Sequence, residues 1–441
     1  MNALRQLEWA LLELQQGTPL ASVSGAISEI APSHFRVSGL SRFVRLGELI
    51  GVNSTGQSQL GEVVRIDSEG IIAKPFDRQF TGGLGSVAFR LPPLSFAPDP
   101  SWKGRVINAL GAPLDGQGPL IPGSRAVSAE AEAPPAMKRA RVHKPLRTGV
   151  RVIDLFAPIC AGQRVGIFAG SGVGKSTLLA MLARSEGFDT VVLALVGERG
   201  REVREFIEDV LGHDRNRAVT IVSTGDESPM MRRLAPKTAM AVAEYFRDRG
   251  ESVLLVVDSI TRFAHASREV ALAAGEPAVA RGYAPTVFTD LPRLLERAGP
   301  GTEGSGTITG IFSVLVDGDD HNEPIADTIR STLDGHIVLS RSIADQARYP
   351  AVDILASVSR LAHSVWDPDE RELVSKLRAM IAKYEDTRDV RLMGGYQSGR
   401  DSALDQAVDM VPRIYGAMRQ DVAATPSADP FRELRDTLKG E

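Results

Sequence analysis

The chain has 441 residues, of which 43% are hydrophobic and 24% are charged, and this composition is typical of a globular protein with two or three domains. The net charge of −4 argues against a general nucleic-acid-binding surface, and the single cysteine, Cys160, excludes an intrachain disulfide framework. We expect no signal peptide and no membrane span, because the N-terminus is charged and no apolar run approaches about 18 residues.

The first segment, residues 1–19, is predicted to contain a short amphipathic helix. The pattern covers residues 1–16, and Gly17 and Pro19 end it. Its leucines have the 3-4-3 spacing of a coiled-coil seam: Leu4, Leu7, Leu11 and Leu14. A seam this short either packs on the chain's own body or binds a partner, and the sequence leaves both interpretations open.

Residues 20–95 alternate short apolar runs with turns rich in Gly, Ser and Asp, which predicts a small β-barrel. Residues 96–147 follow as a predicted connector. Between 122 and 145 this connector holds four prolines and a basic cluster, which favours an extended chain over a helix. A solvated linker is the ordinary interpretation of such a cluster, and a binding patch is the alternative.

Residues 148–364 alternate strand-type and helical patterns. Continuous apolar runs occur at 190–196, 218–222, 252–257 and 307–316. Such runs fit a sheet that is covered on both faces, and they therefore predict a mostly parallel α/β domain. From residue 365 to 441 the pattern becomes helical, with amphipathic stretches at 373–384 and 404–418.

The segment 169–177, Ala-Gly-Ser-Gly-Val-Gly-Lys-Ser-Thr, lies between a strand-type run and a helical pattern, the context of a phosphate-binding loop. Backbone N–H groups and the helix N-terminus can bind phosphate there, although Ala169 stands where the strict pattern has glycine. Lys175 can reach the β- and γ-phosphates, and Ser176 can ligate Mg²⁺. The predicted nucleotide-binding residues of the loop are Gly170, Ser171, Gly172, Val173, Gly174, Lys175, Ser176 and Thr177.

Two acids at strand ends are candidates for the chemistry. Asp258 ends the apolar run that begins at Leu254, where an acid supports Mg²⁺ in nucleotide hydrolases. Glu198 ends the strand that follows the loop helix and can orient the attacking water. Glu202 and Glu205 are nearby rivals, and Arg199 either touches the γ-phosphate or pairs with an acid.

Longer segments resemble hexameric ATPases related to the catalytic subunits of rotary F-type and V-type ATPases, and most closely the flagellar type III protein export ATPases. These segments are 104–116, 146–154, 161–176, 226–233, 274–283 and 325–341. The resemblance runs from about residue 25 to about residue 420, and Ala169 is usual in this family. It implies ATP hydrolysis with Mg²⁺ by a RecA-like P-loop α/β core that has an N-terminal β-barrel and a C-terminal helical domain.

The resemblance also implies residue roles. Glu198, in Gly-Glu-Arg, matches the glutamate that activates water, and Asp258 matches the Walker B acid. Tyr349 matches an aromatic residue near adenine, and Tyr396 is a looser match to a second adenine contact. Arg360, in Ser-Val-Ser-Arg, matches the arginine finger that one rotary subunit lends to its neighbour.

Glu198 and Arg360 occur together in this chain, whereas the rotary enzymes carry the matching residues on two subunit types. Identical interfaces can therefore build equivalent sites, which predicts a homohexameric ring. A rotary β-type subunit would not need its own Ser-Val-Ser-Arg, a non-catalytic ring member would tend to lose Glu198 or Lys175, and an RNA-translocating hexamer would show an N-terminal RNA-binding region. The ATPase of virulence injectisomes is the closest rival, because only a few loop residues favour the flagellar interpretation.

The same resemblance implies partners and a location. We expect an export regulator to bind residues 1–16, and we expect contacts with export gate and stalk proteins, export substrates and chaperones. No nucleic acid is expected as a partner. The expected location is cytoplasmic, at the inner face of the bacterial inner membrane, which the chain reaches through its partners.

Overall fold

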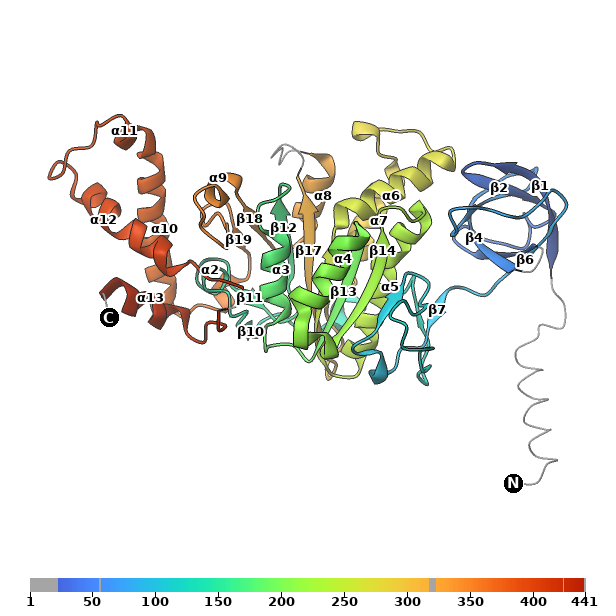
Figure 1. Cartoon of the computed structure of the whole chain (residues 1–441), viewed down its shortest axis with the longest axis horizontal. Helices are drawn as coiled ribbons and strands as arrows, with labels where there is room; N and C mark the ends of the chain where they lie inside the picture. Colours follow the sequence, from blue (N-terminus) through green and yellow to red (C-terminus); the bar gives the residue numbers. More distant parts are fainter. Residues whose placement is uncertain (1–22, 55–56, 317–322, 423, 440–441) are drawn as a thin grey trace, which may run out of the picture. The chain divides into compact units, whose positions relative to one another are not determined.

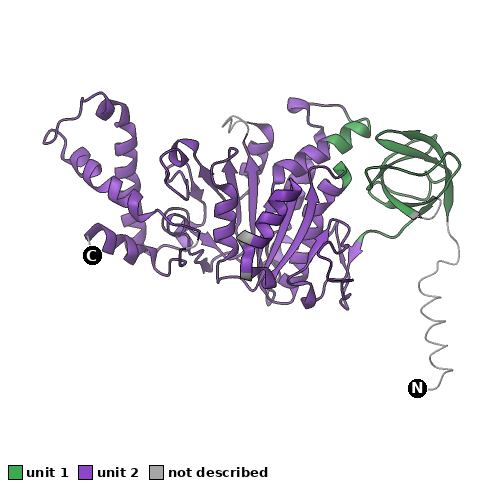
Figure 2. Cartoon of the chain, viewed as in Figure 1, with its two compact units in different colours: residues 1–94, 228–230, 269–276 green, residues 95–227, 231–268, 277–441 purple. Residues whose placement is uncertain are grey.

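The computed structural model describes residues 23–54, 57–316, 323–422 and 424–439. These residues form two compact units, which Figure 2 shows in different colours. The first unit comprises residues 23–94, 228–230 and 269–276, and the second comprises the other described residues. Within these ranges no helix has the length and hydropathy that a membrane crossing requires. The helix predicted at residues 1–16 lies outside the described residues.

The first unit is built on a closed antiparallel barrel (Figure 1), and the predicted β-barrel is confirmed. Its strands are β1 (Ser24–Ala31), β2 (His34–Ser38), β3 (Leu49–Ser54), β4 (Gln57–Ile66), β5 (Ile71–Pro75) and β6 (Val87–Arg90). They close in the order β1-β2-β5-β4-β3-β6. Alternate side chains point inward, so that Phe35, Val37, Ile50 and Val52 are fully buried in one apolar core.

The second unit contains a nine-stranded sheet in the order β19-β18-β12-β17-β15-β13-β14-β8, with β16 paired to β17. The strands are β8 (Val106–Asn108), β12 (Arg164–Ala169), β13 (Thr190–Glu198), β14 (Ala218–Thr224), β15 (Ser252–Asp258), β16 (Gly299–Pro300), β17 (Thr307–Leu315), β18 (Gly335–Leu339) and β19 (Val358–Ser359). All pairs from β18 to β8 along this order are parallel, and their apolar strands are almost wholly buried. The predicted α/β fold is confirmed.

Helices and short irregular elements complete this part of the chain (Figure 1). The helices are α2 (Arg151–Phe156), α3 (Lys175–Ala183), α4 (Gly200–Glu205), α5 (Pro229–Asp248), α6 (Ile260–Ala273), α7 (Pro285–Leu295), α8 (Pro324–Thr332) and α9 (Arg341–Ala344). Two small ribbons pair β7 (Ser95–Phe96) with β9 (Val127–Ser128) and β10 (Pro145–Leu146) with β11 (Ile159–Cys160). Short stretches of tighter or wider helix occur at η1 (Pro100–Trp102), η2 (Ala136–Lys138), η3 (Phe206–Leu211), η4 (Gly212–Arg217), η5 (Ala280–Gly282) and η7 (Ala362–Ser364).

Part of the predicted connector belongs to the sheet. Strand β8 extends the sheet beyond β14, with Ile107 opposite Ile221. Trp102 is buried nearby and donates its indole N–H to the carbonyl of Ile121, 2.8 Å away. A three-residue strand is too short to produce a recognisable alternation of apolar residues, which explains why the sequence did not indicate it.

The C-terminal region is helical, as predicted, with α10 (Pro368–Asp386), α11 (Arg388–Leu392), α12 (Ser402–Ala417) and α13 (Pro430–Lys439). Helix α10 begins with a capping box formed by Asp367 and Glu370. The buried residues of α10 and α12, among them Leu377 and Val411, join the same hydrophobic core as Leu179 of α3. The C-terminal helices therefore share a core with the helix that follows the glycine-rich loop.

Candidate active site

Three strand ends bring the predicted site residues together. Strand β12 leads into the glycine-rich loop, β13 ends at Glu198, and β15 ends at Asp258. These strands run parallel within one sheet, so their carboxyl ends lie along the same edge. That edge is where open α/β sheets bind ligands.

The loop between β12 and α3 has the backbone that its glycines permit. Gly172 has a φ of 78° and Gly174 a φ of 92°, a left-handed conformation that favours glycine. Helix α3 begins directly afterwards at Lys175, so its free backbone N–H groups face the loop. This combination of loop and helix N-terminus is suited to binding phosphate.

Lys175 lies between two carboxylates. Its Nζ atom forms an ion pair with Oδ1 of Asp258 and lies 3.9 Å from Oε1 of Glu198. The hydroxyl of Ser313, on β17, donates to the same oxygen of Asp258 at 2.6 Å. The predicted lysine and both predicted acids therefore meet in one cluster.

The carboxyl group of Glu198 is the acid best placed to act as a base. The pairing of β13 with β14 shifts register between Val196 and Glu198, and Gly197 has a φ of 70°. Burial and the carboxylate of Asp258 raise the pKa of Glu198 to about 7, although Lys175 acts in the opposite direction. A carboxyl group that is half ionised near neutral pH is suited to accepting a proton from water.

The rival acids are more open to solvent. The side chain of Glu198 is 19% exposed, compared with 40% for Glu202 and 56% for Glu205. Glu202 hydrogen bonds to Glu198 and lies 3.5 Å from Nη1 of Arg199, which is itself 83% exposed. Glu205 pairs with the exposed Arg201 at 3.3 Å. The geometry favours Glu198 as the base and places Glu202 beside it.

Lys175, Glu198 and Glu202 line a cavity of about 740 Å³, which is within the size range of small-ligand sites. Its walls include the loop, the predicted Glu198 and Arg199, and also Arg262 of α6. Neither Arg262 nor Ser313 was predicted as a site residue. A serine inside the otherwise apolar run 311–316 is a signal that could have pointed to Ser313.

The residues present fit Mg²⁺, which prefers oxygen ligands and usually retains several of its waters. Ser176 is exposed at the start of α3, and Asp258 offers a carboxylate at the end of β15. No group of three metal-ligating acids, histidines or cysteines occurs in the part of the chain that the structure describes. A magnesium ion that arrives with the nucleotide phosphates does not need such a group.

Of the three remaining predicted residues, Tyr349 lies beside the glycine-rich loop and Tyr396 and Arg360 lie in other parts of the chain. The ring of Tyr349 lies against the loop, since a Cβ atom placed on Gly174 would be 3.3 Å from two of its ring atoms. The hydroxyl of Tyr396 donates to Asp405 at 2.7 Å within the C-terminal helices, and its prediction as a second adenine contact gains no support. Arg360 is exposed and follows β19, which is the strand at the end of the sheet.

Comparison with known proteins identifies related sequences for most of the chain. Residues 149–359 match the ATP synthase alpha/beta family, nucleotide-binding domain, and residues 366–436 match the T3SS EscN ATPase C-terminal domain. A flagellum-specific ATP synthase of Rhizobium meliloti is 56% identical over 94% of this chain and 89% of its own length. A type 3 secretion system ATPase of Xanthomonas euvesicatoria is 42% identical over 94% of both chains.

The fold is similar to that of a solved assembly. The structure of the assembled ATPase EscN of enteropathogenic E. coli, in complex with its central stalk EscO, is matched with a TM-score of 0.84. The match has 35% identity and covers 94% of this chain and 99% of that chain. The similarity therefore includes the barrel, the sheet and the C-terminal helices.

Proposed function

This chain belongs to the ATP synthase alpha/beta family, among its flagellar and type III secretion ATPases, and from that premise we propose that it hydrolyses ATP to energise flagellar protein export. The identity of 56% to a flagellum-specific relative, against 42% to a secretion-system ATPase, supports the flagellar role over the injectisome role. The match of residues 366–436 to the EscN C-terminal domain argues against a rotary β-type subunit.

One observation carries the catalytic part of the proposal, namely the meeting of Lys175, Glu198 and Asp258 at one edge of the sheet. A phosphate-binding loop, a charge-neutralising lysine, a partly protonated glutamate and an acid for the metal are the parts that phosphoryl transfer to water requires. Each lies on a different strand or helix end, which holds the groups in a fixed geometry.

Each of the proposed active-site residues has a separate role in the hydrolysis of ATP. Loop N–H groups and Lys175 bind the phosphate oxygens and stabilise the negative charge that develops on them. Glu198 accepts a proton from the attacking water as the bond to the γ-phosphorus forms and the bond to the β-phosphate oxygen breaks. Ser176 and Asp258 would hold Mg²⁺, which would supply positive charge that neutralises the phosphate oxygens. Arg199 lines the cavity with an exposed side chain and is proposed to contact the γ-phosphate.

Assembly completes the proposed site. Arg360 is exposed at the end of the sheet, and its backbone N–H donates to the carbonyl of Asp334 at 3.0 Å, which fixes its position. We assign it as the arginine finger that serves the cavity of a neighbouring copy, in a homohexameric ring. The similarity to the assembled ATPase EscN with its central stalk supports both self-assembly and a stalk partner for this chain.

The remaining partners follow from the same role. An export regulator is proposed to bind residues 1–16, and export substrates, chaperones and the export gate are proposed to meet the ring. These contacts would hold the chain at the cytoplasmic face of the inner membrane.

The decisive experiment measures phosphate release from Mg-ATP by the purified chain. Lys175→Ala is expected to abolish turnover, because it removes the positive charge nearest to the predicted phosphate position. Arg201→Ala is the matched control, since Arg201 is 79% exposed and pairs only with Glu205 among its described contacts. Substantial turnover by Lys175→Ala would contradict the assignment. Restored motility of a flagellated host that lacks its own export ATPase would test the flagellar role separately.

A further inference from the structure

The segment that carries Tyr349 is attached to the C-terminal region at two points, the side chain of Arg348 and the carbonyl of Tyr349. Tyr349 follows Arg348 and a tight turn in which Ala347 has a φ of 52°. The ring of Tyr349 is 41% exposed and lies against Gly174 of the glycine-rich loop. Exposure of this kind leaves one face of the ring available to a nucleotide base.

The first attachment is a stacked pair. The guanidinium carbon of Arg348 lies 3.6 Å from the ring centroid of Tyr415, on α12. The hydroxyl of Tyr415 in turn donates to the carboxylate of Glu385, on α10, at 2.6 Å. Arg348 is therefore held by a tyrosine whose own position is fixed by a second helix.

The second attachment is Gln420, three residues after the end of α12. Its backbone N–H donates to the carbonyl of Tyr349 at 3.0 Å. Its side chain accepts from the N–H of Arg151 at 3.0 Å and donates to the carbonyl of Gly149 at 2.7 Å. Gln420 is only 6% exposed, so these bonds replace its hydrogen bonds to water.

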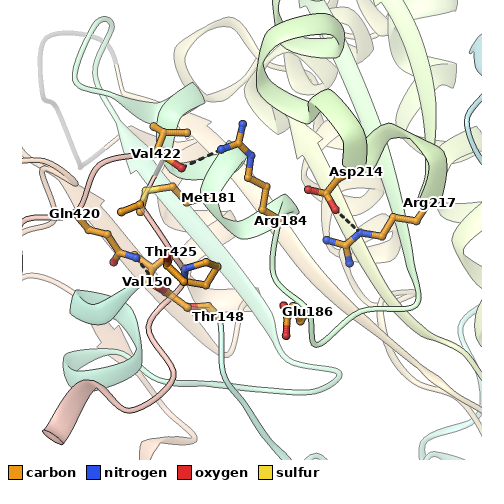
Figure 3. A pocket seen from close by; sticks show the side chains of 13 residues that line it. Thr148, Val150, Met181, Arg184, Glu186, Asp214, Arg217, Gln420, Val422 and Thr425 are labelled. Carbon is orange, nitrogen blue, oxygen red and sulfur yellow. Dashed lines mark hydrogen bonds and ion pairs between the residues drawn. The ribbon is translucent and has the colours of Figure 1, made fainter. Parts of the chain in front are cut away.

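The segment around Gln420 also contacts the end of α3. Figure 3 shows Gln420 and Val422 on one wall of a cavity of about 570 Å³, with Arg184 and Met181 beside them. Arg184 donates to the carbonyl of Val422 at 2.9 Å (Figure 3). The segment 420–422 thus joins the Tyr349 segment to the helix that begins with Lys175.

We propose that Tyr415 and Gln420 are positioning residues for the nucleotide base, because they hold the backbone of Arg348 and Tyr349 in the place where the Tyr349 ring can stack on adenine. This inference rests on the proposed function, since it takes the nucleotide to bind at the glycine-rich loop. The C-terminal region then sets the affinity for the base, while a separate set of residues binds the phosphates.

The physical reason is the entropy of ordering. A ring that is already fixed loses little conformational entropy when it stacks on a base. A ring on a loosened segment must be ordered when the ligand binds, and this ordering lowers the affinity. Phosphate binding depends on the loop and Lys175, which Tyr415 and Gln420 do not contact directly. The two parts of the ligand should therefore respond differently to the same substitution.

The test compares two probes by titration calorimetry on the full chain, Mg-ADP and Mg-pyrophosphate. Gln420→Ala keeps the backbone N–H that donates to Tyr349 but removes the side-chain bonds to Arg151 and Gly149 that hold this N–H in place. Tyr415→Leu and Gln420→Ala are both expected to weaken Mg-ADP binding roughly 5- to 10-fold, within the range of one lost base–aromatic stacking contact. Binding of Mg-pyrophosphate is expected to change less than about twofold, because pyrophosphate has no base. In the ATPase assay the KM for ATP should rise while kcat at saturation stays near that of the wild type.

Tyr245→Leu is the matched control. Tyr245 lies on α5, and the guanidinium carbon of Arg249 is 5.7 Å from its ring centroid, a tyrosine–arginine pair with no described contact to the Tyr349 segment or to Tyr415. It is expected to leave the affinity for both probes unchanged. Tyr415→Phe keeps the ring face toward Arg348 and should retain most of the Mg-ADP affinity.

Several results would overturn the inference. Unchanged Mg-ADP affinity in Tyr415→Leu and Gln420→Ala would do so, as would an equal loss for both probes, which would indicate general damage to the phosphate site. If Tyr415→Leu does not fold, Arg348→Met tests the same contact from the loop side by the same criteria. Unchanged Mg-ADP affinity in Tyr349→Ala, with hydrolysis still dependent on Lys175, would refute this inference and leave the proposed ATPase function intact.

Discussion

Replacement of Glu198 by glutamine tests the chemistry of the site most directly. Glutamine keeps the size and shape of the side chain but cannot accept a proton from water at neutral pH. We expect Glu198→Gln to bind Mg-ATP and to release phosphate at least about 100-fold more slowly, the lower end of the effect of a general base.

The raised pKa of Glu198 predicts how strongly kcat/KM of the wild type depends on pH. Burial and Asp258 raise the pKa of Glu198 to about 7, and only the ionised form can act as a base. The ionised fraction then rises from about one tenth at pH 6 to about nine tenths at pH 8, so kcat/KM should increase roughly tenfold across this range. A glutamate with an ordinary pKa would be ionised throughout, and its profile would be almost flat.

The assay is the initial rate of phosphate release at low Mg-ATP, measured between pH 6 and pH 8. Glu202→Gln is the matched control, because Glu202 hydrogen bonds to Glu198 and this bond contributes to the raised pKa. An amide at position 202 donates to the ionised form of Glu198, so the midpoint should move to lower pH while turnover continues. A flat wild-type profile, or normal turnover by Glu198→Gln, would refute the assignment of the base.

Two further predictions concern assembly and partners. Mixed rings of Arg360→Ala and Lys175→Ala should recover activity that neither variant has alone, because one interface can combine an intact Lys175 with an intact Arg360. An arginine finger accelerates the reaction roughly 10³–10⁵-fold, so the recovery is measurable in a simple ATPase assay. Failure of proven mixed rings to recover would contradict a shared site. Deletion of residues 1–16 should remove the complex with the export regulator in a pull-down and leave the circular dichroism spectrum of the remaining chain unchanged, whereas a retained complex would favour packing of that segment on the chain itself.

Local patterns allowed much of the fold and the site to be predicted. The glycine-rich loop needs its glycines at φ values of 78° and 92°, and such a constraint is visible in sequence. Glu198 and Asp258 were found because each ends an apolar strand, and parallel strands place such ends along one edge. These signals depend on neighbouring residues alone.

Other features depend on contacts between distant parts of the chain, which a single sequence does not indicate. Arg341 donates to the carbonyl of Ser171 at 3.0 Å across a separation of 170 residues. Gln420 bonds to Gly149 across 271 residues. The residues around Arg341 and Gln420 do not indicate which distant residue each of them contacts. Strand β8 was missed for a different reason, since three residues cannot display a period.

The balance of charge around Lys175 affects which cellular anions can bind to the site. Lys175, Arg199 and Arg262 are matched by Glu198, Glu202 and Asp258, so the cluster has almost no net charge when the acids are ionised. A bare phosphate ion must compete with these acids for the lysine and brings nothing to replace the pairing it disrupts. A nucleotide accompanied by a divalent cation brings its own positive charge for Asp258 and frees the lysine. The site is therefore expected to bind free inorganic phosphate weakly and to be occupied chiefly by magnesium-bound nucleotide.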